Sequence, residues 1–185
     1  MESIVAISIF VVFSTVLLAN YPQFLNKTAI NTLAHEIALS IRQAQVYGQN
    51  VREFGVGSGV FPSYGVFFSA AQTKEYTIFA DISDNDKKYN EVPCGVIGTE
   101  CLERFIISSG ASIVDICGNV KTSPPGVCGL DTLNVSFTRP NPDANILGFN
   151  GIETLYSDAL IKISSPKGDS QKNIIIWSTG QISVE

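Results

Sequence analysis

The chain begins with an uncharged apolar segment that is long enough to cross a membrane as a helix. From Ser3 to Ala19, thirteen of the seventeen residues are apolar, and no charged residue occurs between Glu2 and Lys27. At about 1.5 Å per residue, seventeen helical residues span roughly 26 Å, close to the hydrocarbon thickness of a bilayer. A helix is the expected state, because a single segment in lipid must satisfy its own backbone hydrogen bonds. We therefore expect a hydrophobic helix over residues 1–26.

The lone acid ahead of this segment, Glu2, separates the roles that such a helix can have. A secretory signal peptide carries a basic region before its apolar stretch, and none is present here. An ordinary membrane anchor usually carries Lys or Arg on its cytoplasmic flank. A carboxylate in lipid without a nearby base is costly and needs a partner. The alternative is that Glu2 is only a helix-terminal acid, which the helix dipole favours by itself.

The segment MESIVAISIFVVFSTVLLANYP resembles the N-terminal helix of type IV pilins and type II secretion pseudopilins. In that family a prepilin peptidase cuts the precursor ahead of a Phe-Thr-Leu-type stretch, which precedes a Glu and an apolar helix. The resemblance implies that Glu2 pairs with the methylated N-terminal amine of a neighbouring subunit during assembly. It also implies a non-enzymatic homo-oligomer without cofactors: a helical filament, built by pilus assembly machinery from subunits held in the cytoplasmic membrane.

The resemblance starts at the residue before the Glu. The family's Gly cleavage residue and Phe-Thr pair are absent, and the chain starts with Met1. We expect the leader and the first mature residues to be missing, either because the sequence omits them or because the gene start was assigned late.

Helical periodicity continues over residues 27–49. Five apolar side chains lie within about 40° of Ile37 on a helical wheel and predict a face that packs on a globular head. They are Ile30, Leu33, Ile37, Ile41 and Ala44. Leu39 and Val46 point roughly 180–200° away and predict a second face that contacts other helices in a fibre. Scattered surface residues are the alternative explanation, because single exposed apolar side chains are common.

Two interruptions of this helix are expected. Asn20, Tyr21 and Pro22 fall near the membrane exit, and a proline there removes a backbone hydrogen bond and kinks or loosens a helix. This resembles the partly melted helix of assembled pili. Gly48 marks the expected C-terminal end.

The remaining residues, 50–185, have the texture of a β-rich head, and the expected fold class is α+β. The helix should pack on an antiparallel sheet. Strand-like runs are expected at 64–69, 75–81, 104–108, 112–117, 132–138, 159–164, 173–178 and 181–184. The last two flank Thr179-Gly180, a hairpin signal, so the chain should end in three consecutive antiparallel strands. Several head segments, such as PSYGVFFS and LNVSFTRPNPDA, also resemble type IV pilin-like heads.

Four cysteines lie in this head. Cys94 and Cys101 enclose six residues, and Cys117 and Cys128 enclose ten. Local pairing is the simplest of the three connectivities available to four cysteines. A zinc site is the competing explanation, but these spacings are not those of zinc knuckles. An exported head lies in an oxidising compartment, so we predict two local disulfides.

Other candidate sites are weaker. Asp81, Asp84, Asp86 and Glu91 form an acid-rich turn whose oxygen atoms could hold calcium, although no Gly follows Asp86 as in an EF-hand and a solvated turn is the alternative. The single histidine, His35, lies on the helix without a catalytic constellation. We find no phosphate-binding loop, dinucleotide fingerprint or nucleophile elbow.

The sequence therefore favours a structural pilin that supports adhesion, motility or DNA uptake. The alternative is a minor pilin or pseudopilin of a type II secretion or competence machine. The net charge of −5 gives no general basic footprint for nucleic acid, and any DNA or surface ligand is unidentified at this level. We expect the subunit in the cell membrane before assembly and in an extracellular fibre afterwards.

Overall fold

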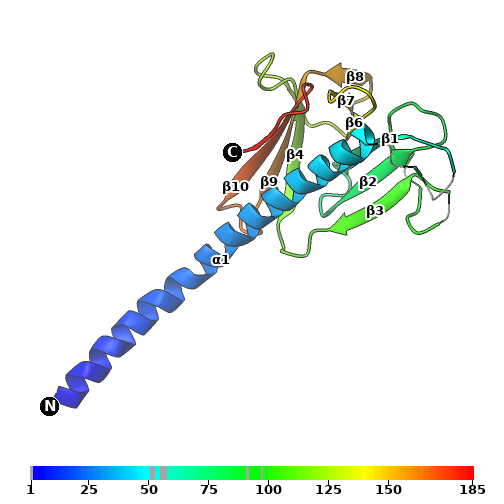
Figure 1. Cartoon of the computed structure of the whole chain (residues 1–185). Coiled ribbons are helices and arrows are strands. Elements are labelled where there is room, and N and C mark those ends of the chain that lie inside the picture. The colour runs from blue at the N-terminus through cyan, green and yellow to red at the C-terminus, as the bar shows by residue number, and fades with distance from the viewer. Residues whose placement is uncertain (1, 51–52, 55–57, 91, 97) are drawn as a thin grey trace.

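The computed structural model describes residues 2–50, 53–54, 58–90, 92–96 and 98–185, apart from the side chains of residues 2, 16–20 and 22–23. In this part of the chain a single long helix, α1 (Glu2–Gln49), precedes the strands of the head (Figure 1). The strands are β1 (Ser63–Ser69), β2 (Glu75–Asp81), β3 (Cys101–Ile106), β4 (Ser112–Gly118), β5 (Val127–Cys128), β6 (Thr132–Phe137), β7 (Ala144–Phe149), β8 (Glu153–Tyr156), β9 (Asp158–Ser164), β10 (Gln171–Trp177) and β11 (Ile182–Val184).

The strands form two antiparallel sheets. Sheet A has the order β3-β2-β1-β6-β7-β8, and sheet B has the order β11-β10-β9-β4-β5. The α+β class is thus as expected, and the last three strands are consecutive and antiparallel, as predicted. The expectation of one sheet was too simple, because the chain passes from sheet A at β3 to sheet B at β4 and returns to sheet A at β6.

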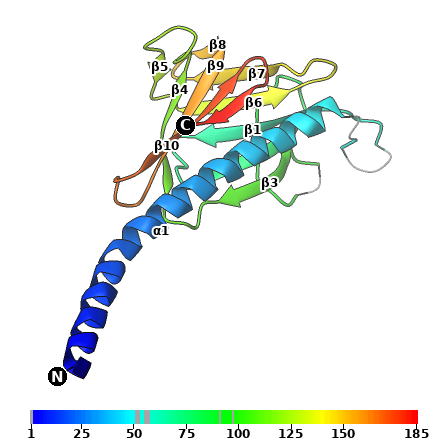
Figure 2. The same cartoon turned by 60° about the vertical axis from the view of Figure 1, so that its left-hand side comes forward.

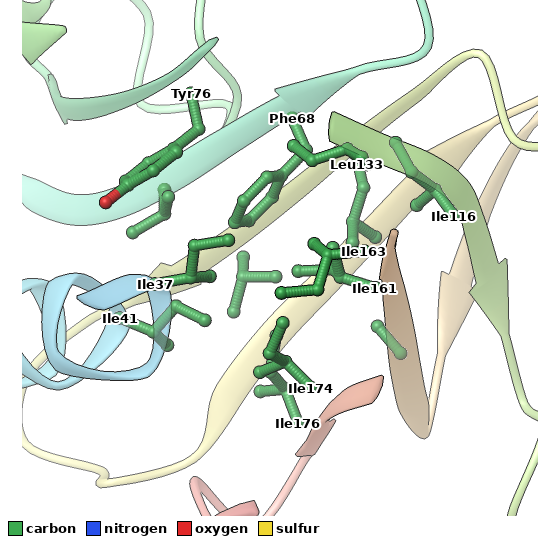
Figure 3. Packing of buried hydrophobic residues seen from close by; sticks show 14 of the residues in the cluster. Ile37, Ile41, Phe68, Tyr76, Ile116, Leu133, Ile161, Ile163, Ile174 and Ile176 are labelled. Atoms are coloured by element: carbon green, nitrogen blue, oxygen red, sulfur yellow. The ribbon is translucent and has the colours of Figure 1, made fainter. Parts of the chain in front are cut away.

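The second half of α1 packs on both sheets at once. It contacts β1, β2 and β6 of sheet A and β9, β10 and β11 of sheet B. All five apolar residues of its predicted inner face are buried in one core. Figure 3 shows Ile37 and Ile41 near Phe68 and Leu133 of sheet A and Ile174 and Ile176 of sheet B. The helix therefore closes the core that the two sheets share.

Gly48 has a different role from the predicted one. It lies inside α1, one residue before the helix ends, and a Cβ placed there would lie 2.4 Å from the carbonyl oxygen of Phe137. Only a residue without a side chain allows the helix to approach the backbone of β6 so closely. Gly48 is therefore a close-packing glycine.

The backbone is helical throughout α1, so the helix is not broken at Asn20–Pro22, while the predicted kink at Pro22 stays a prediction. A proline removes only its own N–H donor, so the turns on either side can continue. The side chain of Pro22 lies outside the described residues.

Among the residues that the structure describes, no helix is both long enough and apolar enough to cross a membrane.

Three strands were missed by the sequence analysis: β5, β7 and β8. The glycine within β7, Gly148, has a packing role. A Cβ at Gly148 would lie 2.6 Å from the ring of Tyr156, and one at Gly118 would lie 2.4 Å from the same ring. Gly118 belongs to sheet B and Gly148 to sheet A. The ring of Tyr156 thus packs against both sheets.

The shared core makes a prediction about stability. Ile37 is fully buried where α1 meets both sheets. Ile37→Ala should lower the unfolding free energy by about 2–5 kcal/mol, because it removes buried methyl groups and leaves a cavity. Urea unfolding followed by the fluorescence of Trp177, the single tryptophan, would measure the change.

The matched control lies two residues further along the same helix. Leu39 is 67 % exposed, so Leu39→Ala should change the unfolding free energy by less than about 0.5 kcal/mol. Equal effects of the two substitutions would contradict the packing described here.

Candidate assembly surface

The first half of α1 extends away from the head without any cover. Both views show it as a free rod beyond the sheets (Figures 1 and 2). Its large apolar side chains are more than half exposed, among them Ile4, Val5, Ile7, Ile9, Phe10, Val11, Val12 and Phe13. Monomeric soluble proteins rarely expose so much contiguous apolar surface, and such patches mark association with other apolar matter.

The second half of α1 keeps one face free as well. Leu39 is 67 % exposed and Val46 is 51 % exposed, on the side of the helix opposite its buried residues. The structure thus places both side chains away from the head, as the helical wheel predicted.

A shallow groove lies beside Leu39. It has a volume of about 310 Å³ and runs between α1, at His35, Leu39 and Arg42, and the last strand, at Ile182 and Val184. His35 is exposed. The sequence analysis missed the contribution of β11, because nothing local in the chain relates residue 39 to residue 182.

Two of the four predicted assembly residues can be placed only in part. Glu2 and Pro22 belong to the backbone of α1, but their side chains lie outside the described residues. Their assembly roles therefore stay predictions. Leu39 and Val46 are described in full, and their exposure is compatible with a contact to a neighbouring subunit.

Both predicted disulfides are present. Cys94 is bonded to Cys101, and Cys117 is bonded to Cys128. The first fixes the segment that follows β2 to the start of β3, where Cys101 joins a small second core with Phe67 and Phe79. The second links the paired strands β4 and β5. The competing explanation, a zinc site built from these four cysteines, is excluded because their sulfur atoms form the two disulfides.

The acid-rich turn is organised by Asp81. This carboxylate is only 2 % exposed. Its oxygens accept the backbone N–H of Asn85 at 2.9 Å and of Lys87 at 2.7 Å, and the hydroxyl of Ser63 at 3.3 Å. Asp81 therefore stabilises the chain reversal that follows β2.

The structure groups the acids differently from the sequence. Carboxylate oxygens of Asp81, Asp84 and Glu100 lie within 4.8 Å of one another. Glu100, which sequence reasoning missed, is buried and accepts the backbone N–H of Asn90 at 3.0 Å and the hydroxyl of Ser83. Asp86 is instead paired with Lys88 at 2.9 Å. Glu91, the fourth predicted ligand, lies outside the described residues, and calcium binding stays a prediction.

Burial and hydrogen bonds shift the pKa values of three groups in this turn. Loss of solvent raises the pKa of Asp81, partly opposed by the N–H groups of Lys87 and Asn85, while the carboxylate of Glu100 acts in the same direction as burial. Exposed Asp84 has a lowered pKa, because the amide of Asn90 donates a hydrogen bond to it. Hydrogen bonds to Glu153 and Asp86 raise the pKa of Lys88.

Comparisons with known proteins give no relative: no family model, no curated protein and no solved structure matches the chain. What the structure itself establishes is a long N-terminal helix packed on antiparallel sheets.

The raised pKa of Asp81 predicts a pH dependence. An acid whose pKa is higher in the folded state binds protons on folding, so its contribution to stability improves as the pH falls through the folded value. The unfolding free energy of the wild type relative to Asp81→Asn should therefore rise between pH 7 and pH 4. Urea unfolding of both proteins at several pH values would measure this difference. A change in favour of the variant would mean that the carboxylate is stabilised in its charged form.

Proposed function

We propose that the protein is a structural subunit of an extracellular helical filament of the type IV pilus kind. The observation that supports this most is the division of α1. One face of its second half is buried in the head, whereas the large apolar side chains that the structure describes in its first half are exposed. The N-terminal resemblance to pilins supports the same function.

The exposed apolar first half of α1 needs a cover in water. In a water-exposed fibre, the only comparable environment for an apolar helix is other copies of the same helix. At about 25 cal/mol per Å² of apolar surface, burial of a helix of this length yields tens of kcal/mol relative to water. Relative to lipid the gain is close to zero, because lipid tails are as apolar as the side chains. A subunit that starts in the membrane would thus need a motor for extraction but not for persistence in the fibre.

The lone acid gives such a fibre its register. A carboxylate carried into an apolar bundle is unfavourable by several kcal/mol unless a cation meets it. In this proposal the cation is the N-terminal amine of the adjacent subunit, as in the family that the segment resembles. A subunit in the wrong register would leave both charges unpaired.

The proposed function is tested by looking for the protein in sheared surface fibres. Electron microscopy should show filaments, and mass spectrometry should identify this chain as their main component. A low copy number at the fibre tip would favour the minor-pilin alternative. Recovery only from the membrane, in cells that carry fibres made of another protein, would contradict the proposal.

Removal of the acid should separate membrane insertion from assembly. Glu2→Ala leaves the apolar segment intact, so the subunit should accumulate in the membrane at its normal level while the filament yield falls at least about tenfold, because the partner amine is left uncompensated. Glu36→Ala, at an exposed acid of the same helix, is the control and should assemble normally. Normal fibre numbers in Glu2→Ala cells would refute the role of the pair.

A charge on the free face of α1 should have the same effect by a different route. Leu39→Asp and Val46→Asp place a carboxylate where the proposal puts a neighbouring helix, and each should reduce the fibre yield. Both positions are exposed in the subunit, so the head should stay folded. Ile106→Asp is the matched control, since Ile106 is 73 % exposed on β3. If the control reduced assembly as much as the helix variants, the contact face would lie elsewhere.

A further inference from the structure

A second cavity lies on the face of sheet A that is turned away from α1. It has a volume of about 200 Å³ and is bordered by β6, β7, the start of β8 and the segment Lys88–Asn90. Alternation along β6 separates the two faces of the sheet: Leu133 and Val135 belong to the core that α1 shares, and Thr132 and Asn134 point to the opposite side. The cavity is thus remote from the proposed assembly surface.

The floor of the cavity is fixed by strand register. Asn134 is paired with Phe67 of β1 and with Leu147 of β7. Thr132 is paired with Phe149 in the same way. Directly opposite residues in antiparallel strands have Cβ atoms about 4.5–5.5 Å apart. An amide, a hydroxyl and an aromatic ring therefore lie side by side on a rigid surface.

The amide of Asn134 is only half used. The side chain is 6 % exposed, and its Oδ1 accepts the backbone N–H of Tyr89 at 3.0 Å. Asn134 lines the cavity, and none of the described residues accepts a hydrogen bond from its NH₂ group. This NH₂ group is not among the fully buried unpaired atoms of the described residues, so solvent reaches it. It is therefore an accessible donor for an acceptor of a ligand.

The wall and rim show what kind of ligand would fit. Phe149 offers an apolar ring surface, being 39 % exposed. The cation at the rim, Lys88, is already held by Asp86 at 2.9 Å and by Glu153 at 2.8 Å. No free positive charge is therefore left on this side chain to attract a phosphate or a carboxylate.

The segment over the floor is held in place before any ligand arrives. The ring of Tyr89 packs on Phe67 and Phe79, with centroid distances of 5.2 and 5.7 Å. The ion pair between Lys88 and Glu153 ties the segment to β8. A preformed site of this kind loses little conformational entropy on binding.

We propose that this cavity binds one neutral saccharide unit. A sugar hydroxyl can accept from the amide of Asn134 and exchange a hydrogen bond with the hydroxyl of Thr132. The apolar face of the ring covers Phe149. The volume lies below the range of about 300–1,000 Å³ that is usual for drug-sized ligands, so it accommodates one unit of a glycan and not several. The site is independent of filament assembly.

The test uses the full chain in a detergent without a sugar headgroup. The probes are methyl glycosides of glucose, galactose, mannose, N-acetylglucosamine and N-acetylgalactosamine, with cellotriose and chitotriose as a second set. At least one should shift the NMR signals of residues 132–134 and 147–149, with an affinity on the order of 1 mM for a single unit. Tighter binding of a trisaccharide would identify a polymer as the source of the unit, and equal binding a terminal sugar.

Two substitutions separate the site from a general surface effect. Asn134→Asp keeps an acceptor for the N–H of Tyr89 but removes the free NH₂ group, and should weaken binding about tenfold. Asn150→Asp makes the same change at an exposed turn outside the cavity and should leave binding unaltered. Phe149→Leu should also weaken binding, whereas Ile152→Leu on the neighbouring turn should not.

The proposal would be overturned by a panel in which no sugar shifts these signals. It would also be overturned if Asn134→Asp, folded as judged by its NMR spectrum, bound the sugar as well as Asn150→Asp does.

Discussion

The fold depends on the packing of one helix, α1, whose second half is buried on one face and whose first half is exposed. The inner face of the second half of α1 completes a core that neither sheet could close alone, with Ile37 and Ile41 buried against strands of both. Since this burial fixes the helix on the head, the apolar first half must project away from it. The exposed surface is thus a direct consequence of how the head is built. The head is folded around its own core, whereas the described apolar side chains of the first half of α1 are left without cover.

Close approaches between backbone elements hold the head together around this helix. Gly48 lets α1 reach the backbone of Phe137, and Gly118 and Gly148 make room for the ring of Tyr156. Each of these glycines lacks a Cβ for a packing reason. The opposite face of sheet A is covered by the segment after β2, which the buried carboxylate of Asp81 and the disulfide between Cys94 and Cys101 fix in place. That cover also forms the wall of the proposed saccharide site.

Sequence reasoning reached the features that depend on local pattern. The inner face of α1, most of the strands and the local cysteine pairs all follow from spacing along the chain. It failed where distant residues decide the outcome. The packing role of Gly148 was not predicted because Tyr156 belongs to another strand, and Glu100 was not grouped with Asp81 because the turn brings them together only in the fold. The groove beside Leu39 was missed for the same reason, as Ile182 and Val184 are distant in sequence. The division of the head into two sheets is likewise a matter of long-range pairing.

The most direct test of this account is a density map of the assembled fibre in which individual side chains can be traced. The account predicts that the first halves of the α1 helices form a continuous bundle along the axis, with Leu39 and Val46 against neighbouring helices and both sheets on the outside. Helices splayed apart in the fibre, or these two side chains in solvent, would contradict it.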